Sequence, residues 1–323
     1  MPAFAGRTGP QKTRSVVDSA VWTCPYIYKT TNYGDNWRRI DGGIPDDTFA
    51  RVVREDPARK GLLFVGTEAG MFVSFNDGSD WQPLRLNLPP VPITDLTFRQ
   101  NNLVAATQGR GFWVLDDLFV VQQASEDIAS KPLHVYRPHT TSMLPGARAA
   151  GKFEGKNPSR DVPLYYFIRD EIEGELSIDI LNDAGDVIRH YSSEESEHDR
   201  CRIGNMDPRR PFEIKYPASK KGLNKWGWNL RSENIRCIPD IAIFAGFNGP
   251  RVVPGTYRAR FRIGDHEDTV EFTVAQDPRS PASEADIREW RARLNEVSTL
   301  MNDILAKLHD LRKARVQIEA LMS

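Results

Sequence analysis

The feature that most constrains the fold is a turn motif that occurs twice, 44 residues apart. Residues 30–37 (TTNYGDNW) and 74–81 (SFNDGSDW) both read [ST]-x-N-x-G-x-[ND]-W. Short segments of alternating apolar residues, typical of β-strands, precede and follow each copy. A period of about 40–44 residues with about four short strands per repeat is that of a β-propeller blade. The sequence therefore predicts a mainly β fold that begins with a partial propeller of two to three blades over residues 22–120.

Each position shared by the two copies has a structural role in a hairpin turn. Glycine supplies the positive φ that the turn requires. The asparagine side chain accepts from backbone N–H groups, and the hydroxyl before it adds a second bond. The tryptophan is expected to bury its ring between neighbouring sheets. These roles fall to Thr30, Asn32, Gly34 and Trp37 in the first copy and to Ser74, Asn76, Gly78 and Trp81 in the second.

The two motifs resemble the Asp-box (BNR) repeats of sialidase-like propellers and of sortilin-type sorting receptors. The run 26–118 is most similar to the end of the propeller in bacterial sortilin-like proteins, which are often labelled glycosyl hydrolases. The segments that carry this resemblance are 44–47 (IPDD), 52–57 (VVREDP), 60–63 (KGLL), 66–68 (GTE) and 107–118 (TQGRGFWVLDDL). The resemblance implies a terminal Ig-like domain, a helical tail and an extracellular or periplasmic location. Both motifs depart from the family pattern, with Asn32 and Asn76 where the family has Asp.

The predicted propeller is incomplete, because closed propellers have about four to eight blades. The segment 1–21 does not continue the repeat backwards, and we expect it to be disordered. We interpret the chain as the C-terminal portion of a longer protein. An open set of blades exposes strand edges, so self-association through that edge is expected.

The second half of the chain predicts a linker and then a β-sandwich. Four prolines and a run of small residues indicate a linker over 121–160, with 133–136 as a candidate strand within it. Short strand patterns within 161–277 suggest an Ig- or fibronectin-like sandwich, with Trp226 and Trp228 filling its core. The expected strands are 162–168, 175–181, 187–191, 225–230, 255–263 and 269–275. Cys201 and Cys237 can pair only if the fold brings their Cα atoms within about 7 Å, which the sequence leaves open.

The tail predicts one long amphipathic helix over 283–322, which begins with a capping box at Ser283 and Asp286. Ten positions follow at alternating spacings of four and three, and nine of them are apolar, which is a heptad pattern. They are Trp290, Leu294, Val297, Met301, Ile304, Leu308, Leu311, Arg315, Ile318 and Met322. This stripe is expected to pack on the sandwich, on a second copy of the chain, or on another helix.

Composition and motifs exclude several functions. Lys+Arg 43 balance Asp+Glu 44, so no basic field attracts nucleic acid. The longest apolar runs are too short to cross a bilayer. We find no P-loop, GxSxG, HExxH or GxGxxG sequence, and expect no cofactor. The polar run 190–201 matches no metal-ligand spacing, so no metal site is predicted there.

We therefore interpret the chain as a non-catalytic binding or scaffold segment whose ligand is a protein or a glycan. Arg110, between two glycines, is the best candidate for a ligand contact, followed by Arg54. The alternative is a fragment of a sialidase-like glycoside hydrolase whose active site lies in missing blades. Such an enzyme needs an arginine cluster, a Tyr–Glu nucleophile pair and an Asp acid/base. The residue types present in the blade region are Arg51, Arg54, Arg110, Glu55, Glu68 and Asp116.

Overall fold

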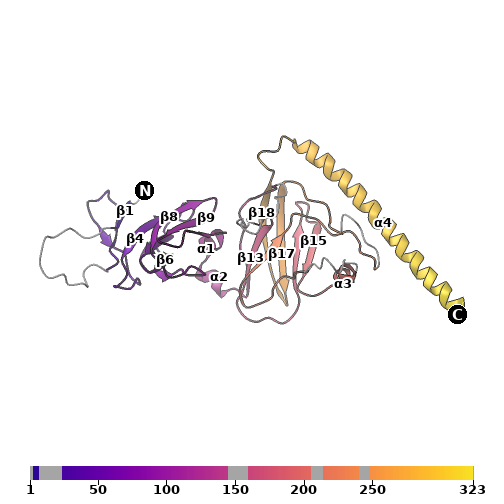
Figure 1. Ribbon diagram of the computed structural model, residues 1–323, viewed down its shortest axis with the longest axis horizontal. Helices are drawn as coiled ribbons and strands as arrows, with labels where there is room; N and C mark the ends of the chain where they lie inside the picture. The colour runs from indigo at the N-terminus through magenta and orange to yellow at the C-terminus, as the bar shows by residue number, and fades with distance from the viewer. Residues whose placement is uncertain (1–2, 7–23, 145–158, 205–213, 240–246, 323) are drawn as a thin grey trace. The chain divides into compact units, whose positions relative to one another are not determined.

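The computed structural model describes residues 3–6, 24–144, 159–204, 214–239 and 247–322, with only the backbone considered at 3–6 and 202–204. The chain divides into one unit that ends at Gln123 and a second that begins at Ala124. Both units consist mainly of β-strands, and the C-terminus is one long continuous helix (Figure 1). The predicted mainly β fold with a C-terminal helix is therefore confirmed.

The first unit contains three antiparallel sheets. The first sheet consists of β1 (Ala3–Gly6), β2 (Ile27–Thr30) and β3 (Arg38–Arg39). The second consists of β4 (Ala50–Glu55), β5 (Leu63–Thr67), β6 (Gly70–Ser74) and β7 (Gln82–Pro83). The third consists of β8 (Ile93–Arg99), β9 (Asn102–Thr107) and β10 (Phe112–Leu115). In the second and third sheets, every strand pairs with the next strand in the chain.

The beginning of the chain differs from the expectation of disorder. β1 lies within the segment 1–21 and pairs with β2, Ala3 opposite Thr30 and Gly6 opposite Ile27. Residues 7–21 lie outside the described residues. The pairing is physically reasonable because a strand edge offers unpaired N–H and C=O groups to any extended segment nearby.

The central sheet of the first unit is covered on both faces. Phe64 of β5 joins a core with Ile93 and Leu96 of β8, whereas Leu63 and Val65 of the same strand join a core with Ile27. Successive side chains of a strand point to opposite faces, so β5 is buried along its whole length. This two-sided burial explains the continuous apolar run 62–65 in the sequence.

The second unit contains two sheets that share one core. One sheet has the order β11 (Leu133–Val135), β13 (Val162–Ile168), β16 (Gly222–Trp228). The other has the order β12 (Thr141–Ser142), β18 (His266–Ala275), β17 (Gly255–Ile263), β14 (Leu176–Leu181), β15 (Val187–Ser192). Trp228 and Tyr166 of the first sheet and Phe261 of the second are fully buried in this core. Trp226 is only half-buried and packs at its margin, in contrast to the expectation for both tryptophans.

The segment 121–144 is more structured than the expected linker. After the helix α1 (Phe119–Gln123) it contains α2 (Glu126–Ser130) and the strands β11 and β12. β11 confirms the candidate strand at 133–136. β11 pairs with β13 and β12 pairs with β18, so both belong to the sheets of the second unit. Prolines 132 and 138 flank β11, a placement that leaves its ladder donors intact. The rest of the expected linker, 145–158, lies outside the described residues.

The helix α3 (Glu197–Gly204) is tied to the segment before residue 240 by a disulfide. Cys201 of α3 bonds Cys237, with 6.0 Å between the Cα atoms. This distance is within the range that a disulfide spans. The structure therefore answers the question of pairing that the sequence left open.

The C-terminal helix α4 (Glu284–Met322) begins at the predicted capping box, in which the Ser283 N–H donates to Asp286 Oδ2 at 2.9 Å. It packs on the second unit through Leu305, which is buried against Ile235 and Ile238. Only part of the predicted stripe takes part in this contact. Met301 and Leu308 pack at the margin of the cluster around Leu305, whereas Ile304 is exposed.

Candidate functional site

The two repeated turns form the same hydrogen bonds. In the first, the Gly34 N–H donates to Thr30 Oγ1 at 2.9 Å and the Asn36 N–H donates to Asn32 Oδ1 at 3.0 Å. In the second, the Gly78 and Asp80 N–H groups donate in the same way to Ser74 Oγ and Asn76 Oδ1, both at 2.9 Å. Gly34 and Gly78 have φ angles of 104° and 82°. These residues are therefore occupied in holding the turns.

The two tryptophans of the turns are placed differently. Trp81 is buried, and its indole N–H donates to the Ile40 carbonyl of the preceding repeat at 2.6 Å. Trp37 is 46% exposed, contrary to the expectation that both rings are buried. Trp81 has the preceding repeat beneath it, whereas no described segment takes that place under Trp37. Burial of the tryptophan ring therefore depends on the neighbouring repeat and not on the turn that carries the ring.

Neither arginine proposed as a ligand contact lines the pocket that is described below. Arg54 bridges two sheets, donating from Nη2 to Asp95 Oδ1 at 2.7 Å and from Nε to the Leu96 carbonyl at 3.0 Å. The Asp95 carboxylate thereby balances the positive charge of Arg54. Arg110 stands in the exposed turn between β9 and β10, and its carbonyl accepts from Trp113 Nε1 at 3.2 Å. Arg110 is exposed and therefore accessible to a ligand, and its backbone carbonyl is bonded within the turn.

The other candidate charged residues of the first unit have structural partners or are exposed. Arg51 forms an ion pair with Glu68. Glu55 accepts from the Gly61 N–H at 3.0 Å. Asp116 is exposed on the segment that follows β10. The contacts of these residues are thus those of a folded surface, and Arg51 and Arg54 are each paired with a carboxylate, Glu68 and Asp95.

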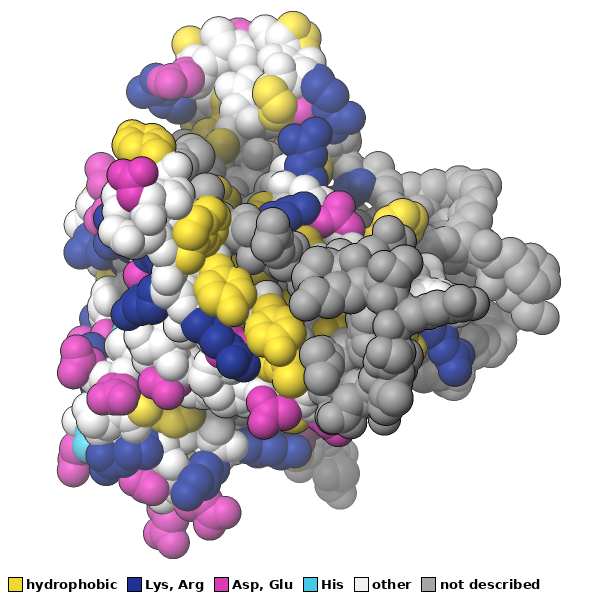
Figure 2. Space-filling view, turned by 90° about the vertical axis from the view of Figure 1, so that its left-hand side faces the viewer, with side chains coloured by type: hydrophobic (Ala, Val, Ile, Leu, Met, Phe, Trp, Pro, Cys, Tyr) yellow, Lys and Arg dark blue, Asp and Glu magenta, His cyan; other side chains and the backbone are white. Residues whose placement is uncertain are grey.

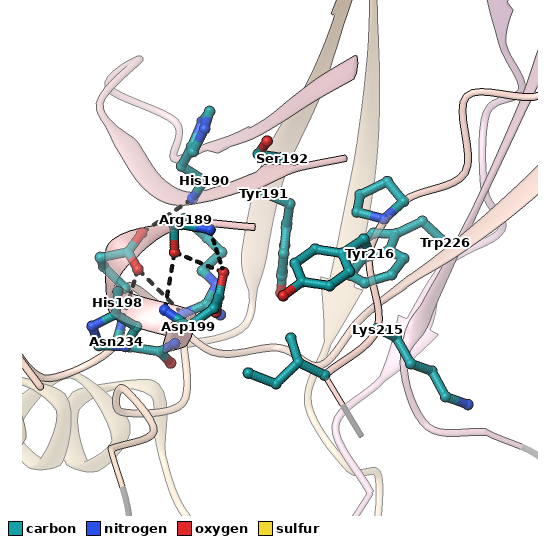
Figure 3. A pocket seen from close by; sticks show the side chains of 14 residues that line it. Arg189, His190, Tyr191, Ser192, His198, Asp199, Lys215, Tyr216, Trp226 and Asn234 are labelled. Atoms are coloured by element: carbon teal, nitrogen blue, oxygen red, sulfur yellow. Dashed lines mark hydrogen bonds and ion pairs between the residues drawn. The ribbon is translucent and has the colours of Figure 1, made fainter. Parts of the chain in front are cut away.

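The candidate site lies in the second unit, at a pocket of about 430 Å³ (Figure 3). Five chain segments line it: residues 189–192 of β15, residues 196, 198 and 199 at the start of α3, the loop 214–217, Trp226 of β16, and residues 233–234. β15 and β16 are edge strands of the two different sheets. The pocket therefore forms where the open edges of the two sheets come together.

One wall of the pocket is aromatic. The rings of Tyr191 and Trp226 meet edge to face, with 5.2 Å between their centroids. Tyr216 lies beside them, and the three rings gather on one side in Figure 3. The guanidinium of Arg189 covers the Tyr191 ring at 4.7 Å from its centroid. Strand pairing positions Tyr191, because it lies opposite Ile178 in the register of β14 and β15 and points towards the core side.

The opposite wall is polar and is held by local hydrogen bonds. Asp199 closes a capping box at the start of α3, since its N–H donates to Ser196 Oγ at 3.1 Å and Ser196 Oγ donates to its Oδ2 at 2.6 Å. Glu233 accepts from the His190 N–H at 3.2 Å and forms an ion pair with Arg189 Nη1 at 3.4 Å. The Cys201–Cys237 disulfide ties α3 to the segment that supplies Glu233.

Two donors of this pocket are buried without an acceptor among the described residues. They are the indole Nε1 of Trp226 and the Nε of Arg189. Arg189 is itself only 8% exposed. A buried N–H that makes no hydrogen bond costs about 1–3 kcal/mol. A ligand oxygen that accepts from either group would recover that cost.

Burial decides the protonation of the aromatic wall. Desolvation raises the pKa of Tyr191, and the nearby Arg189 only partly opposes this. The hydroxyl is therefore protonated at neutral pH and serves as a hydrogen-bond donor rather than as a phenolate nucleophile. The arrangement provides stacking surfaces, neutral donors and one matched ion pair, a combination suited to binding a polar ligand.

A buried carboxylate orients the residue between Arg189 and Tyr191. Asp179 lies opposite His190, and its Oδ1 is 2.7 Å from His190 Nδ1. Its Oδ2 accepts from Arg260 Nη2 at 2.8 Å and from Arg262 Nη2 at 2.7 Å. Burial alone would raise the pKa of Asp179, but these cationic partners outweigh it and hold that pKa below its usual value. The cluster fixes the edge strand β15 from its outer side.

Within the described parts of the chain, no group of three His, Cys, Asp or Glu side chains could hold a metal ion. In the same parts, no helix is long and apolar enough to cross a membrane. Sequence reasoning missed the pocket because its residues lie in separate segments. The sequence predicts no metal site in the run 190–201 and places Trp226 in the core, and only the juxtaposition of these segments reveals the site.

Comparison with known proteins adds little. No protein-family model matches the sequence, and no curated protein matches it either. Among solved structures, the chain resembles two crystal structures of the extracellular domain of BT4673 from B. thetaiotaomicron, described as a one-component system in one case and a hybrid two-component system in the other. Each comparison has 9% identity and a TM-score of 0.24, and covers 78% of this chain but 28% of the solved chain. A likeness at this level carries no argument about fold or function.

Proposed function

We propose that this chain is a non-catalytic binding segment of an exported protein, and that it binds a saccharide in the pocket between β15 and β16. The observation that carries the proposal is the Trp226 indole N–H, which is buried in the pocket wall without an acceptor among the described residues. A sugar offers both an apolar C–H face for the aromatic wall and oxygen atoms for such a donor. The pocket volume of about 430 Å³ suits a ligand of one or two sugar rings.

The chemistry of the pocket favours binding over hydrolysis. A glycosidase needs two carboxyl groups of different pKa across the scissile bond. In this pocket Asp199 is engaged in the capping box and Glu233 is engaged with Arg189 and backbone N–H groups. The proposal therefore assigns Trp226, Tyr191 and Tyr216 to stacking, and Arg189 and Trp226 to hydrogen bonding.

Two features support an exported protein of the BNR-repeat, sortilin-like type. The paired turns share their hydrogen bonds, as expected for repeats in neighbouring propeller blades. The Cys201–Cys237 disulfide is typical of proteins that fold in an oxidising compartment. We further propose that the three sheets of the first unit are blades of an incomplete propeller and that the two-sheet unit is an Ig-like sandwich.

The exposed apolar residues of the first unit fit an incomplete ring. Phe112 and Val114 are 80% and 50% exposed on the edge strand β10, and Tyr33 and Trp37 are exposed near the other end of the repeats. Figure 2, which looks onto the indigo side of Figure 1, shows hydrophobic side chains gathered in a band among charged ones. Large exposed apolar surfaces mark places where further protein is expected to pack.

The test is a binding screen of the full chain on an array of neutral, carboxylated and sulfated oligosaccharides, followed by titration calorimetry with the best one. Trp226→Phe keeps an aromatic ring but removes the N–H, and we expect it to weaken binding by about tenfold, the value of one hydrogen bond of about 1.4 kcal/mol. Trp290→Phe is the matched control, because Trp290 is 49% exposed on α4 and does not line the pocket. Binding that is equal in wild type and Trp226→Phe would contradict the proposal.

A further inference from the structure

The helix α4 presents an apolar stripe that the described residues of its own chain leave uncovered. At seven-residue spacing, Trp290, Val297, Ile304, Leu311 and Ile318 are each about half exposed or more. A second row at the same spacing contains Leu300 and Leu321, which are 60% and 88% exposed. Together these rows are the a and d positions of a heptad pattern that runs along the helix.

The contacts of α4 with its own unit lie on a different side of the helix. Arg291 donates to the Arg251 carbonyl, Asn302 accepts from the Arg236 N–H at 2.8 Å, and Arg312 donates to the Pro239 carbonyl at 2.6 Å. Together with the buried Leu305, these positions form a face adjacent to the exposed stripe. Packing on the chain's own unit therefore leaves the stripe open to another helix.

We propose that the stripe pairs with the same stripe of a second copy of the chain, as a parallel two-stranded coiled coil. Val297, Ile304 and Ile318 are β-branched residues at a positions, and Leu300 and Leu321 occupy d positions, a combination that favours two strands in a parallel coiled coil. The occupant is thus a helix of identical sequence and direction.

The charges beside the stripe agree with a parallel pair. The g positions are Glu289, Glu296, Asp303 and Asp310, followed by Gln317. In an antiparallel pair of identical helices, g positions face g positions, so this acidic row would oppose itself. In a parallel pair, each g position faces the e position five residues later on the other helix. Asp310 of each copy then lies opposite Arg315 of the other copy, which gives two ion pairs in the dimer. The other acidic residues of the row face apolar e positions.

Three d positions moderate the strength of the pair, since Ala314 at one of them is small and the other two are charged. Arg293 and Lys307 occupy d positions, and their long side chains must carry their charge out of the seam to water. Polar residues in a coiled-coil seam fix the register and the number of helices at a cost in stability. We therefore expect a reversible dimer rather than a permanent one.

The first test is sedimentation velocity of the full chain over a wide concentration range. Wild type is expected to show a monomer–dimer equilibrium, and Asp310→Arg and Arg315→Asp are each expected to raise the dimer Kd by about tenfold, since like charges then face each other. An equimolar mixture of these two variants restores both ion pairs and is expected to dimerise like wild type. Lys313→Asp is the control, because Lys313 lies outside both the a/d rows and their flanks.

The second test fixes direction and separates dimerisation from folding. In a Cys24→Ser background, Val297→Cys and Ile318→Cys should each cross-link to themselves on mild oxidation, because identical a positions face each other in a parallel pair. Ile304→Asp should abolish the dimer and, at a concentration at which wild type is monomeric, leave the unfolding midpoint unchanged, because Ile304 is 55% exposed in its own chain. Three results would each overturn the inference. They are a wild-type chain that stays monomeric, a variant mixture that does not dimerise, and cross-linking of position 297 to position 318 without cross-linking of either position to itself.

Discussion

The rings of Tyr191 and Trp226 meet edge to face at 5.2 Å across the boundary between two sheets. One residue belongs to the edge strand β15 and the other to the edge strand β16, so the contact closes the margin of the shared core. Such aromatic pairs contribute about 0.5–1.5 kcal/mol beyond the area that they bury. The aromatic wall of the pocket is therefore formed before any ligand arrives, which lowers the ordering cost of binding.

The different surroundings of the two turn tryptophans predict different stabilities for equivalent substitutions. Trp81→Phe removes the N–H donated to the Ile40 carbonyl and leaves a void, and we expect a loss of about 1–3 kcal/mol in the free energy of unfolding. Trp37→Phe at the matching, exposed position should change it by less than about 0.5 kcal/mol. Urea unfolding followed by circular dichroism measures both. Equal losses would mean that Trp81 does not depend on the preceding repeat.

The Asp179 cluster predicts a pH-dependent contribution to stability. Asp179→Asn removes the negative charge that Arg260, Arg262 and His190 contact. We expect the free energy of unfolding to fall by about 1–3 kcal/mol at pH 7. The pKa of Asp179 is lower in the folded chain than its unfolded value of about 3.9. Its stabilising effect is therefore complete above about pH 5 and is lost as the pH falls below about 4 and through the folded-state pKa.

The measurement for this cluster is the urea midpoint of wild type and Asp179→Asn at several pH values from 7 to 3. The gap between the two proteins should narrow at the acid end, because the Asp179 carboxyl of unfolded wild type binds a proton as the pH falls below about 4 and so favours unfolding. A gap that stays constant over the whole range would show that the ionised form of Asp179 is not what stabilises the fold.

The disulfide predicts a large effect of reduction. Replacing Cys201 and Cys237 by serine removes a cross-link between residues that are 36 positions apart in the chain. The chain entropy of the unfolded state then predicts a fall of about 3–4 kcal/mol in the free energy of unfolding. The same disulfide ties α3 to the segment of Glu233, so the double variant should also weaken ligand binding at the pocket. Thermal unfolding with and without reductant measures the first effect, and Cys24→Ser is the control. A wild-type midpoint unchanged by reductant would contradict this prediction.

Much of the fold could be predicted from sequence because the signals are local. The strands 162–168 and 255–263 match β13 and β17, since alternating apolar residues report directly on a half-buried strand. The repeated turns were predictable because their hydrogen bonds join residues at most four apart. The heptad pattern likewise predicted the helix α4.

What the sequence left open depends on partners distant in the chain. Leu305, one residue from the predicted stripe position Ile304, is the buried residue of α4 because Ile235 and Ile238 happen to lie beneath it. The pocket unites Arg189, Trp226 and Glu233 only through strand pairing and the packing of two sheets. None of these neighbourhoods has a local sequence signature.

The most direct test of the central claim is the indole N–H resonance of Trp226 in a ¹⁵N–¹H NMR spectrum of the full chain labelled on tryptophan. Trp226→Phe identifies the signal among the seven tryptophans. On titration with the oligosaccharide selected on the array, we predict a downfield shift of this proton as it gains an acceptor, while the Trp290 signal stays in place. A Trp226 signal that does not move while the sugar binds would contradict the account.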